Sequence, residues 1–354
     1  MIRRPPRSTL SSSSAASDVY KRQLYMSTLQ MKILVTIIIL FCVSFFASAD
    51  ESNYSNPIVF QRFENNETNT ATPDVPGFYG GASIWVMESD GSNPKLLRHP
   101  GYGAKAKHLD HPSISSNGRY VFYAEFESAT IGRQGEAQLY REDLQTQVRT
   151  IIRAQSNCAI HHATLSLDDK DLTYSRDCGL DRSLIMELGN REIVINPIEQ
   201  GTRSSNGMSA GNKVVYQNEK PSRDQSSRTI AIVLSEFDSL GNRTDRQIAD
   251  WEFRNRRATI SNNGNLVAWQ TNSTTGGGKD DILMLNLNKL NGKPIRITKS
   301  PANDGHPFFS RNGEWLLFES DRTGNWEIFK LHIQSGRITQ LTKDPGYIST
   351  RPRW

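Results

Sequence analysis

The sequence predicts an all-β protein, a six-bladed β-propeller of four-stranded antiparallel blades, and three observations support this prediction. Five segments share one pattern: an apolar residue, a serine, a short Asn/Asp/Gly turn and an alternating apolar run. The aligned serines are spaced 51, 43, 52 and 49 residues apart, close to the period of propellers and other repeat arrays. No segment of this region has a long amphipathic helical pattern, which disfavours a helical solenoid. The aligned serines are Ser115, Ser166, Ser209, Ser261 and Ser310.

Each unit is expected to hold four strands. The first strand leads into a turn such as SSNG, SNNG or SRNG, which supplies Asn or Gly where a positive φ is needed. The second strands, clearest at 121–126, 266–271 and 315–320, are rich in β-branched and aromatic residues, which suit a half-buried sheet. The third strands are expected at 138–144, 183–188, 230–237, 281–287 and 327–333, and the fourth at 148–152, 192–195, 246–250, 294–298 and 337–342. A β-sandwich also has many short strands, but it does not require the same turn five times.

The two ends of the repeat region complete one further unit. Segments 56–63 and 82–100 read as the second, third and fourth strands of a unit that lacks a first strand. Segment 347–354 aligns with a first strand alone, since Pro352 matches Pro112 and Pro307. We therefore expect strands from both ends to share one blade, which closes the ring and removes exposed sheet edges.

The front of the chain is expected to lie outside the fold. Residues 1–30 form a leader, and residues 1–23 resemble translated sequencing-adapter sequence, the alternative being a disordered Ser-rich arm. Residues 31–49 read as a signal peptide: Lys32 precedes an apolar run that ends at Ala47-Ser48-Ala49, a small-x-small cleavage site. An uncleaved anchor is the alternative, but the apolar run is shorter than the ~20 residues of a spanning helix. We expect a secreted protein, or a periplasmic one in a bacterium, with the propeller at 50–354 and no stable membrane insertion.

The charge of the chain does not indicate nucleic-acid binding. Residues 1–49 hold six of the 42 basic residues and one of the 37 acidic residues, a net charge of +5. The whole chain also has a formal net charge of +5, so residues 50–354 are neutral. A basic footprint of the kind that nucleic acids require is therefore not expected.

Secretion also bears on the cysteines and the sequons. Cys42 lies in the signal peptide, which leaves Cys158 and Cys178, and an even number in a secreted chain suggests a disulfide. Around the LDDKD turn, an antiparallel register places Cys158 opposite the 178–179 step, close enough for a bond, although two free thiols are the alternative. Four N-x-S/T sequons are candidate glycosylation sites. They lie at Asn53, Asn66, Asn242 and Asn272.

Residues 304–342, DGHPFFSRNGEWLLFESDRTGNWEIFKLHIQSGRITQLT, closely resemble the repeat of TolB-like propellers. That repeat has a Pro-x-aromatic-Ser strand, an Asn/Asp-Gly turn, a strand that ends in Ser-Asp/Asn-Arg, and then Gly-Asn-x-Glu/Asp-Ile-Tyr/Phe. The match is good at 84–98, weaker at 111–152 and 257–299, and eroded at 160–250. The resemblance implies a six-bladed platform for binding. We expect no peptidase activity, which in related propeller enzymes requires an additional α/β-hydrolase domain.

One position of the repeat is occupied mostly by histidine and arginine. The residue before the aligned Pro, Ala or Asn is expected at one mouth of the central channel. These residues are His111, His162, Ser205, Arg257, His306 and Arg351, and His161 comes one position earlier. They are open to three interpretations: polar groups that satisfy loop carbonyls and water, an anion site in which Arg257 and Arg351 hold a carboxylate or sulfate, or a transition-metal site of His111, His161, His162 and His306.

The resulting hypothesis is a secreted, monomeric, non-enzymatic binding module with a protein or glycan ligand at the channel mouth. His111, His162, Arg257, His306 and Arg351 are the predicted ligand-binding residues. No cofactor is expected apart from a divalent metal ion at the histidines. The alternative is a carbohydrate-active enzyme, such as a polysaccharide lyase that uses the His/Arg cluster on acidic glycans. Two further features are expected to be solvated: a mobile loop tip at 274–281 and a basic rim at Arg254, Arg256 and Arg257.

Overall fold

The computed structural model describes residues 56–64, 81–101, 106–127, 136–179, 181–188, 191–221, 228–289 and 292–354. These residues belong to the compact unit Asn53–Trp354. The expected leader, the signal peptide and the sequons at Asn53 and Asn66 lie outside the described residues. In the part of the chain that is described, no helix has the length and apolar character to cross a membrane.

The described residues form antiparallel sheets, with one short 3-10 helix, η2 (Ser273–Thr275). One sheet contains β24 (Tyr347–Arg353), β1 (Ile58–Glu64), β2 (Ser83–Met87) and β3 (Lys95–Arg98), in that order. A second sheet contains β12 (Arg203–Ala210), β13 (Lys213–Pro221), β14 (Arg228–Phe237) and β15 (Arg243–Ala249). A third contains β16 (Arg256–Ile260), β17 (Leu266–Thr271), β18 (Asp281–Asn286) and β19 (Ile295–Arg296). A fourth contains β20 (Asp304–Phe309), β21 (Trp315–Ser320), β22 (Glu327–His332) and β23 (Ile338–Gln340).

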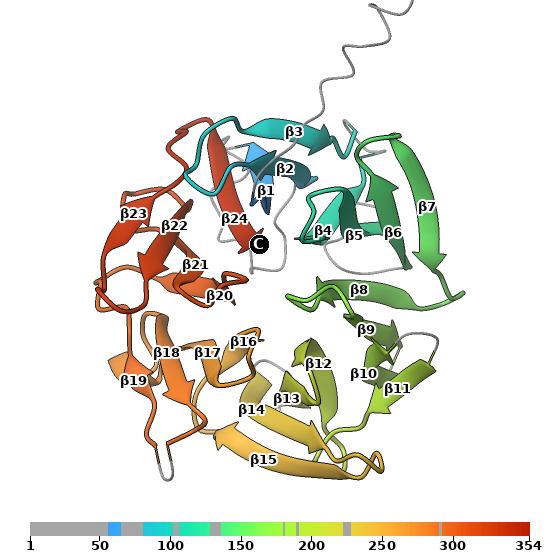
Figure 1. Ribbon diagram of the computed structural model, residues 1–354, viewed down its shortest axis with the longest axis vertical. Helices are drawn as coiled ribbons and strands as arrows, with labels where there is room; N and C mark the ends of the chain where they lie inside the picture. The colour runs from blue at the N-terminus through green and yellow to red at the C-terminus, as the bar shows by residue number, and fades with distance from the viewer. Residues whose placement is uncertain are drawn as a thin grey trace, which may run out of the picture. The chain divides into compact units, whose positions relative to one another are not determined.

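The remaining eight strands form two further groups of four. The first group holds β4 (His108–Ile114), β5 (Tyr120–Phe126), β6 (Ala137–Asp143) and β7 (Val148–Arg153), and the second holds β8 (Ala159–Leu165), β9 (Asp171–Cys178), β10 (Asp181–Leu188) and β11 (Arg191–Ile195). A single parallel pair, Ala137 with Ala159, joins the two groups. Figure 1 shows the groups following one another around a common centre, with β4, β8, β12, β16, β20 and β24 innermost.

The predicted pairing between the ends of the repeat region is present. β24 pairs with β1 in antiparallel register, with Gln61 opposite Thr350 and Arg62 opposite Ser349. The C-terminal strand is therefore the inner strand of the sheet whose other three strands come from residues 58–98.

The recurrent serine has a local structural cause. In four of the described turns between a first and a second strand, its hydroxyl accepts the backbone N–H five residues later, at 2.9–3.0 Å. The same hydroxyl donates to the Asn or Asp side chain two residues on. These bonds satisfy the polar groups of a tight turn, which explains the Ser-x-Asn/Asp pattern. The serines are Ser115, Ser166, Ser261 and Ser310.

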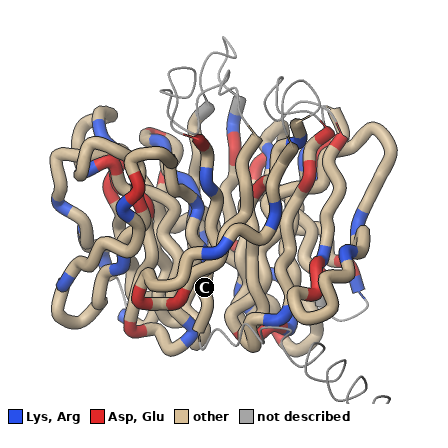
Figure 2. The backbone as a smooth tube through the Cα atoms, turned by 90° about the horizontal axis from the view of Figure 1, so that it is seen from above, with Lys and Arg blue, Asp and Glu red and all other residues tan. Residues whose placement is uncertain are grey.

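Apolar side chains fill the space between neighbouring sheets. Val59 and Val86 pack with Leu109 and Val121 of the next sheet, and similar clusters join the following sheets. Each amphipathic strand thus buries its apolar face against a neighbour, which supplies the main driving force for folding. Charged residues of both signs are interspersed over the described part of the chain (Figure 2), as expected for a region with balanced charge.

The predicted disulfide is present. Cys158 and Cys178 are bonded, with Cα atoms 4.2 Å apart, and Ala159 is paired with Asp177 next to them. The bond fastens the open end of the β8–β9 hairpin.

Replacing both cysteines by serine is expected to lower the free energy of unfolding by about 3 kcal/mol, because the bond restricts a loop of this length in the unfolded chain. Urea unfolding of the oxidised protein and of the Cys158→Ser/Cys178→Ser variant measures the difference. Reduced wild-type protein should match the variant. A loss below about 1 kcal/mol would contradict a stabilising role for the bond.

Candidate functional site

The candidate site is built on a distortion that recurs in the inner strands. In the six described inner strands the register shifts, and the residue at the shift has a positive φ of 45–57° although it is not glycine. Such backbone is unfavourable for a residue with a Cβ and is kept where its surroundings hold it. We call these residues the central cluster. They are His111, His162, Asn206, Arg257, His306 and Arg351.

The central cluster agrees with the predicted ring except in two respects. Asn206, not Ser205, is the member from β12, because Ser205 still pairs regularly with Gln217 and the shift follows it. Asn also adopts this conformation more readily than Ser. Furthermore, the six residues lie within strands, at bulges, whereas the sequence placed them at a channel mouth. Asn206 and Arg257 are half-buried and the other four are buried.

The second strand of the preceding sheet holds the cluster backbone. The backbone N–H groups of five cluster residues donate to side chains from that strand, at 2.7–3.4 Å. The bonds join His111 to Gln61, Asn206 to Ser175, Arg257 to Gln217, His306 to Gln270 and Arg351 to Glu319. For the sixth cluster residue, His162, the corresponding position of the preceding group is Ala124 of β5, which pairs with Asp110. Five of the six strained backbone positions are thus held by a side chain of the neighbouring sheet.

Arg351 is the most deeply buried charged member of the cluster. Its Nη1 donates to Asp110 Oδ1 at 2.7 Å and to Gln61 Oε1 at 2.9 Å. Asp110 Oδ1 also lies 2.7 Å from His111 Nδ1. Arg351 is 1% exposed and Asp110 and His111 are 0% exposed. A buried charge is tolerated when it is paired and hydrogen-bonded, so this ion pair is a structural element of the centre.

Arg257 contacts polar side chains from three strands. Its Nη1 donates to Asn206 Oδ1 at 2.6 Å and lies 3.2 Å from His111 Nε2 and 3.4 Å from His162 Nε2. His306 Nδ1 lies 2.6 Å from Glu319 Oε1. The cluster is therefore one connected network that contains every predicted ligand-binding residue.

Burial lowers the pKa of His111 well below its ordinary value, and the positive charges of Arg351 and Arg257 lower it further, against the opposing effect of Asp110. The ring is therefore neutral in the folded protein at physiological pH.

This depressed pKa predicts loss of stability in mild acid. The unfolded chain binds a proton at this histidine below about pH 6.5 whereas the folded chain does not, so the free energy of unfolding falls as pH decreases, by up to about 1.4 kcal/mol per pH unit. Urea unfolding midpoints at pH 7.5, 6.5 and 5.5 measure the slope. His111→Gln should flatten it and His332→Gln, outside the cluster, should not; equal slopes in both variants would contradict the prediction.

Part of the predicted histidine set could hold a metal ion. Asp110, His161 and His162 each offer a ligand atom, and these atoms lie within 4.8 Å of one another. The ring centroids of His111 and His162 are 4.1 Å apart, and those of His111 and His306 are 6.0 Å apart. One carboxylate and two imidazoles suit zinc or a similar ion, but Arg351 already occupies an oxygen of Asp110. Asp110 was absent from the predicted metal set, although it directly precedes His111.

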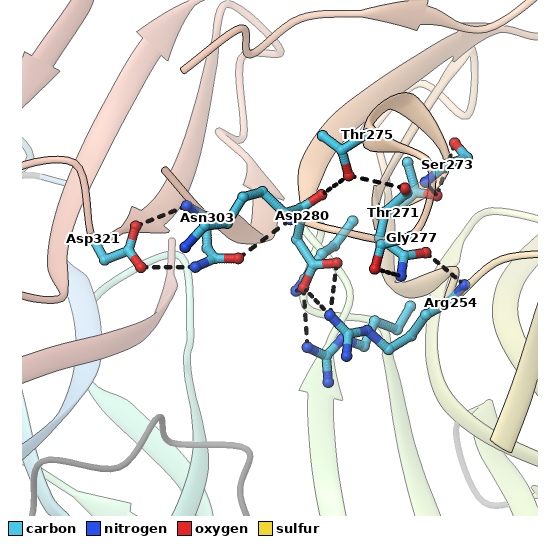
Figure 3. Close-up of polar contacts among 12 residues, drawn as sticks. Arg254, Thr271, Ser273, Thr275, Gly277, Asp280, Asn303 and Asp321 are labelled. Atoms are coloured by element: carbon cyan, nitrogen blue, oxygen red, sulfur yellow. Dashed lines mark hydrogen bonds and ion pairs between the residues drawn. The ribbon is translucent and has the colours of Figure 1, made fainter. Parts of the chain in front are cut away.

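The loop at 274–281, expected to be a mobile tip, is exposed at 275–279 and contains several hydrogen bonds (Figure 3). Buried Asp280 accepts two bonds from Arg254 at 2.9 and 3.0 Å and one from Arg256 at 3.2 Å. Asn303 links the Asp280 backbone to Asp321. The expected solvated basic rim holds for Arg254, whose side chain is 43% exposed, whereas Arg256 and Arg257 are half-buried.

Arg311 was not singled out in the sequence, yet it bridges distant strands. From the β20–β21 turn, its guanidinium donates to the backbone oxygens of Leu167 and Ile114, both at 2.7 Å, and lies 3.3 Å from Asp169 Oδ1. Burial lowers the pKa of Arg311. The side chain thus crosses from the β20 sheet to the β4 and β8 groups at the end of the inner strands where the tight turns lie.

A small cavity lies at the cluster. Its volume is about 20 Å³, enough for roughly one water molecule. The polar residues that line it are Asn206, Arg257, His306, Arg351 and Arg353, together with Thr164. A sugar ring or a peptide side chain of ordinary size does not fit into this space.

Residues 207–211, Gly-Met-Ser-Ala-Gly, match the G-x-S-x-G pattern of a hydrolase nucleophile. Here Ser209 lies in β12, is 1% exposed, and is followed by a turn into antiparallel β13. A nucleophile elbow requires an exposed serine between a strand and a helix, so this match is incidental.

The two described sequons differ in accessibility. Asn242 is exposed in the β14–β15 turn, where its amide donates to Asp238. Asn272 is half-buried at the start of η2, and its side chain bonds both Arg254 and Gly277.

The comparisons with known proteins show the fold. No family model matches the sequence, and no curated protein has a significantly similar sequence. TolB from Acinetobacter baumannii is similar with a TM-score of 0.60 and 15% identity, over 86% of this chain and 67% of that chain. Hydrazine synthase from Kuenenia stuttgartiensis gives 0.61 and 10%, over 84% and 46%. A chain of the nidogen/laminin complex gives 0.52 and 12%, over 83% and 97%.

The sheets gathered around inner strands therefore define a β-propeller. Its fold is like that of TolB, which confirms the resemblance found in the sequence at the level of the fold. At identities of 10–15% the likeness extends to the fold and not to the activity.

Proposed function

We propose that this chain is a secreted, six-bladed binding module without enzymatic activity, closed by a blade that both ends share, and that its ligand is a protein. Six inner strands with the same bulge, and the pairing of β24 with β1, support the blade count and the closure. The signal-peptide sequence at 31–49 supports secretion.

The observation that carries the proposal is a difference between the two ends of the inner strands. Arg311 bridges the end with the tight turns. At the other end, Arg257 and Asn206 are the half-buried members of the cluster. The connection that leads to Arg257 carries Trp251 and Phe253, both half-buried. Aromatic and arginine side chains are the residues that most often anchor protein interfaces, so this end is the proposed binding surface.

A protein is favoured over a glycan because one similar propeller is a chain of the nidogen/laminin complex. The small cavity supports a non-enzymatic role, since about 20 Å³ leaves no room for a substrate beside His306. A lyase that acts on acidic polysaccharides remains the second candidate, and the group of Asp110, His161 and His162 favours it.

The test is capture of extracellular proteins on the immobilised protein, followed by affinity measurement with two matched variants. Trp251 and Trp315 are both half-buried and both lie near a lysine, at 5.6 and 4.9 Å. Trp251 lies in the β15–β16 connection, whereas Trp315 begins β21, directly after the β20–β21 turn. Trp251→Ala is expected to weaken the binding of the captured partner at least about tenfold. Trp315→Ala is expected to leave the affinity for that partner unchanged. Equal effects of the two would reject this surface. Conversion of an acidic polysaccharide to unsaturated products would reject the non-enzymatic role.

A further inference from the structure

A groove lies between the sheet of β16–β19 and the sheet of β20–β23, at the strands farthest from the centre (Figure 1). Its volume is about 630 Å³, within the ~300–1,000 Å³ of ordinary ligand sites. Its wall includes Arg322, in the turn before β22, and residues 333–336, in the turn after β22. The groove is therefore at least as long as β22, a strand of 6 residues that spans about 20 Å.

Strand pairing determines which side chains of β22 and β23 face the groove. Lys330 donates to the backbone oxygen of Ser89 at 2.7 Å, so it points toward the sheet that contains β2 and β3. Successive residues of a strand point to opposite sides, so Leu331 points toward the sheet of β16–β19. Ile338 is paired with Leu331, and directly opposed residues share one side of a sheet. These two lining residues therefore turn their side chains into the groove.

The opposite wall can be assigned in the same way. Gln270 of β17 accepts a backbone N–H of β20, so this side of its sheet faces β20–β23. Ala268 shares that side, being two residues away, and it is paired with Met284, which is in turn paired with Ile295. Ile295 and the lining residue Ile297, two positions later, therefore face the groove.

Both walls leave apolar surface uncovered. Ile295 is 57% exposed and Ile338 is 37% exposed. Apolar surface on two facing walls is typical of a site that receives apolar side chains of a partner. The described lining residues include no aromatic ring on which a sugar could stack. A polypeptide therefore fits this groove better than a glycan.

The chain segments that form the walls are basic. Segments 282–303 and 328–343 contain seven basic residues and no acidic residue, although the chain from 50 to 354 is neutral. Arg296 is paired with Asp281 at 2.8 Å, and Arg322 is paired with Asp304 at 2.6 Å. Lys299 lines the groove, is exposed, and has no ion pair within the described part of the chain. A partner with acidic side chains would complement this charge. The seven residues are Lys289, Lys293, Arg296, Lys299, Lys330, Arg337 and Lys343.

We propose that the groove binds an extended segment of a partner protein in which apolar and acidic side chains alternate. In an extended segment the two kinds of side chain point to opposite sides. The apolar side chains pack between Ile297 and Ile338, and a carboxylate at the rim pairs with Lys299. This site lies at the outer strands, so the inference does not depend on the proposed binding surface at Trp251.

The test is fluorescence polarisation with two labelled peptides of about six residues, one that alternates valine with aspartate and one that alternates valine with lysine. The aspartate peptide should bind the purified protein at least about tenfold more tightly than the lysine peptide, and sodium chloride should weaken its binding. Lys299→Glu should weaken binding of the aspartate peptide about tenfold, because repulsion replaces attraction. Ile338→Thr should also weaken it, while keeping a β-branched residue that suits a strand.

Two matched variants serve as controls and should retain the wild-type affinity. Arg246→Glu reverses a charge at an exposed position of β15. Ile151→Thr changes an isoleucine that is 50% exposed on β7, the outer strand of another group. Equal affinity for the two peptides, or equal effects of the groove variants and the controls, would overturn the proposal. A sulfated hexasaccharide that binds more tightly than the aspartate peptide, and loses its affinity in Lys299→Glu, would also overturn it, since the groove would then be a glycan site.

Discussion

Truncation of the chain before Tyr347, which removes β24, is expected to abolish cooperative folding. The strand supplies the inner edge of its sheet and pairs with β1 from Val59 to Glu64. The removed segment also includes Ile348 and Trp354, which are 4% and 2% exposed, and each such side chain contributes about 2–5 kcal/mol. The combined loss exceeds about 5 kcal/mol, which is comparable with the whole stability of a domain.

The measurement is urea unfolding followed by tryptophan fluorescence and circular dichroism. Adding a synthetic peptide of residues 345–354 should restore the transition, because a free strand can pair with an exposed sheet edge. A peptide with Met in place of Arg351 is the matched control and should restore it less. A truncated chain with the unfolding midpoint of the full chain would show that β24 contributes little to the fold.

The features that the sequence predicted well are local or strictly repeated. The Ser-x-Asn/Asp turns depend on bonds within six residues, so the same three-residue pattern identified four of the hairpins. The disulfide between Cys158 and Cys178 followed from counting the register away from such a turn. The placement of β24 followed from the repeated proline, since Pro352 could be aligned with Pro112 and Pro307.

The features that the sequence did not predict depend on contacts between distant residues. Asp110 and Arg351 are 241 residues apart, and Arg311 meets Ile114 across 197 residues. Their pairing follows from the closeness of the inner strands, which no local pattern records. The bulge was also missed, because positive φ at His, Arg and Asn has none of the glycine signal that usually marks it. That omission explains both the choice of Ser205 over Asn206 and the placement of the ring at a mouth.

Arg351→Met is expected to lower the free energy of unfolding by about 3–5 kcal/mol, the usual cost of removing one partner from a buried ion pair. Asp110 would remain fully buried, with His111 Nδ1 at 2.7 Å as a contact, and His111 is neutral for the reasons given above. Gln61 would also lose the donor that now lies 2.9 Å from its Oε1. The methionine side chain retains much of the apolar volume, so the loss reports charge and hydrogen bonding more than packing.

A double-variant cycle with Asp110→Asn separates this pair from general damage to the centre. If the two charges stabilise each other, the loss in Arg351→Met/Asp110→Asn is smaller than the sum of the two single losses by about 0.5–3 kcal/mol. Arg246→Met, at an exposed position of β15, should change stability by less than about 0.5 kcal/mol. Additive losses in the cycle would mean that Arg351 acts through its backbone position at the bulge rather than through its charge. The centre of the propeller would then be held by the bulges and the side chains that bond their N–H groups, with the ion pair contributing little.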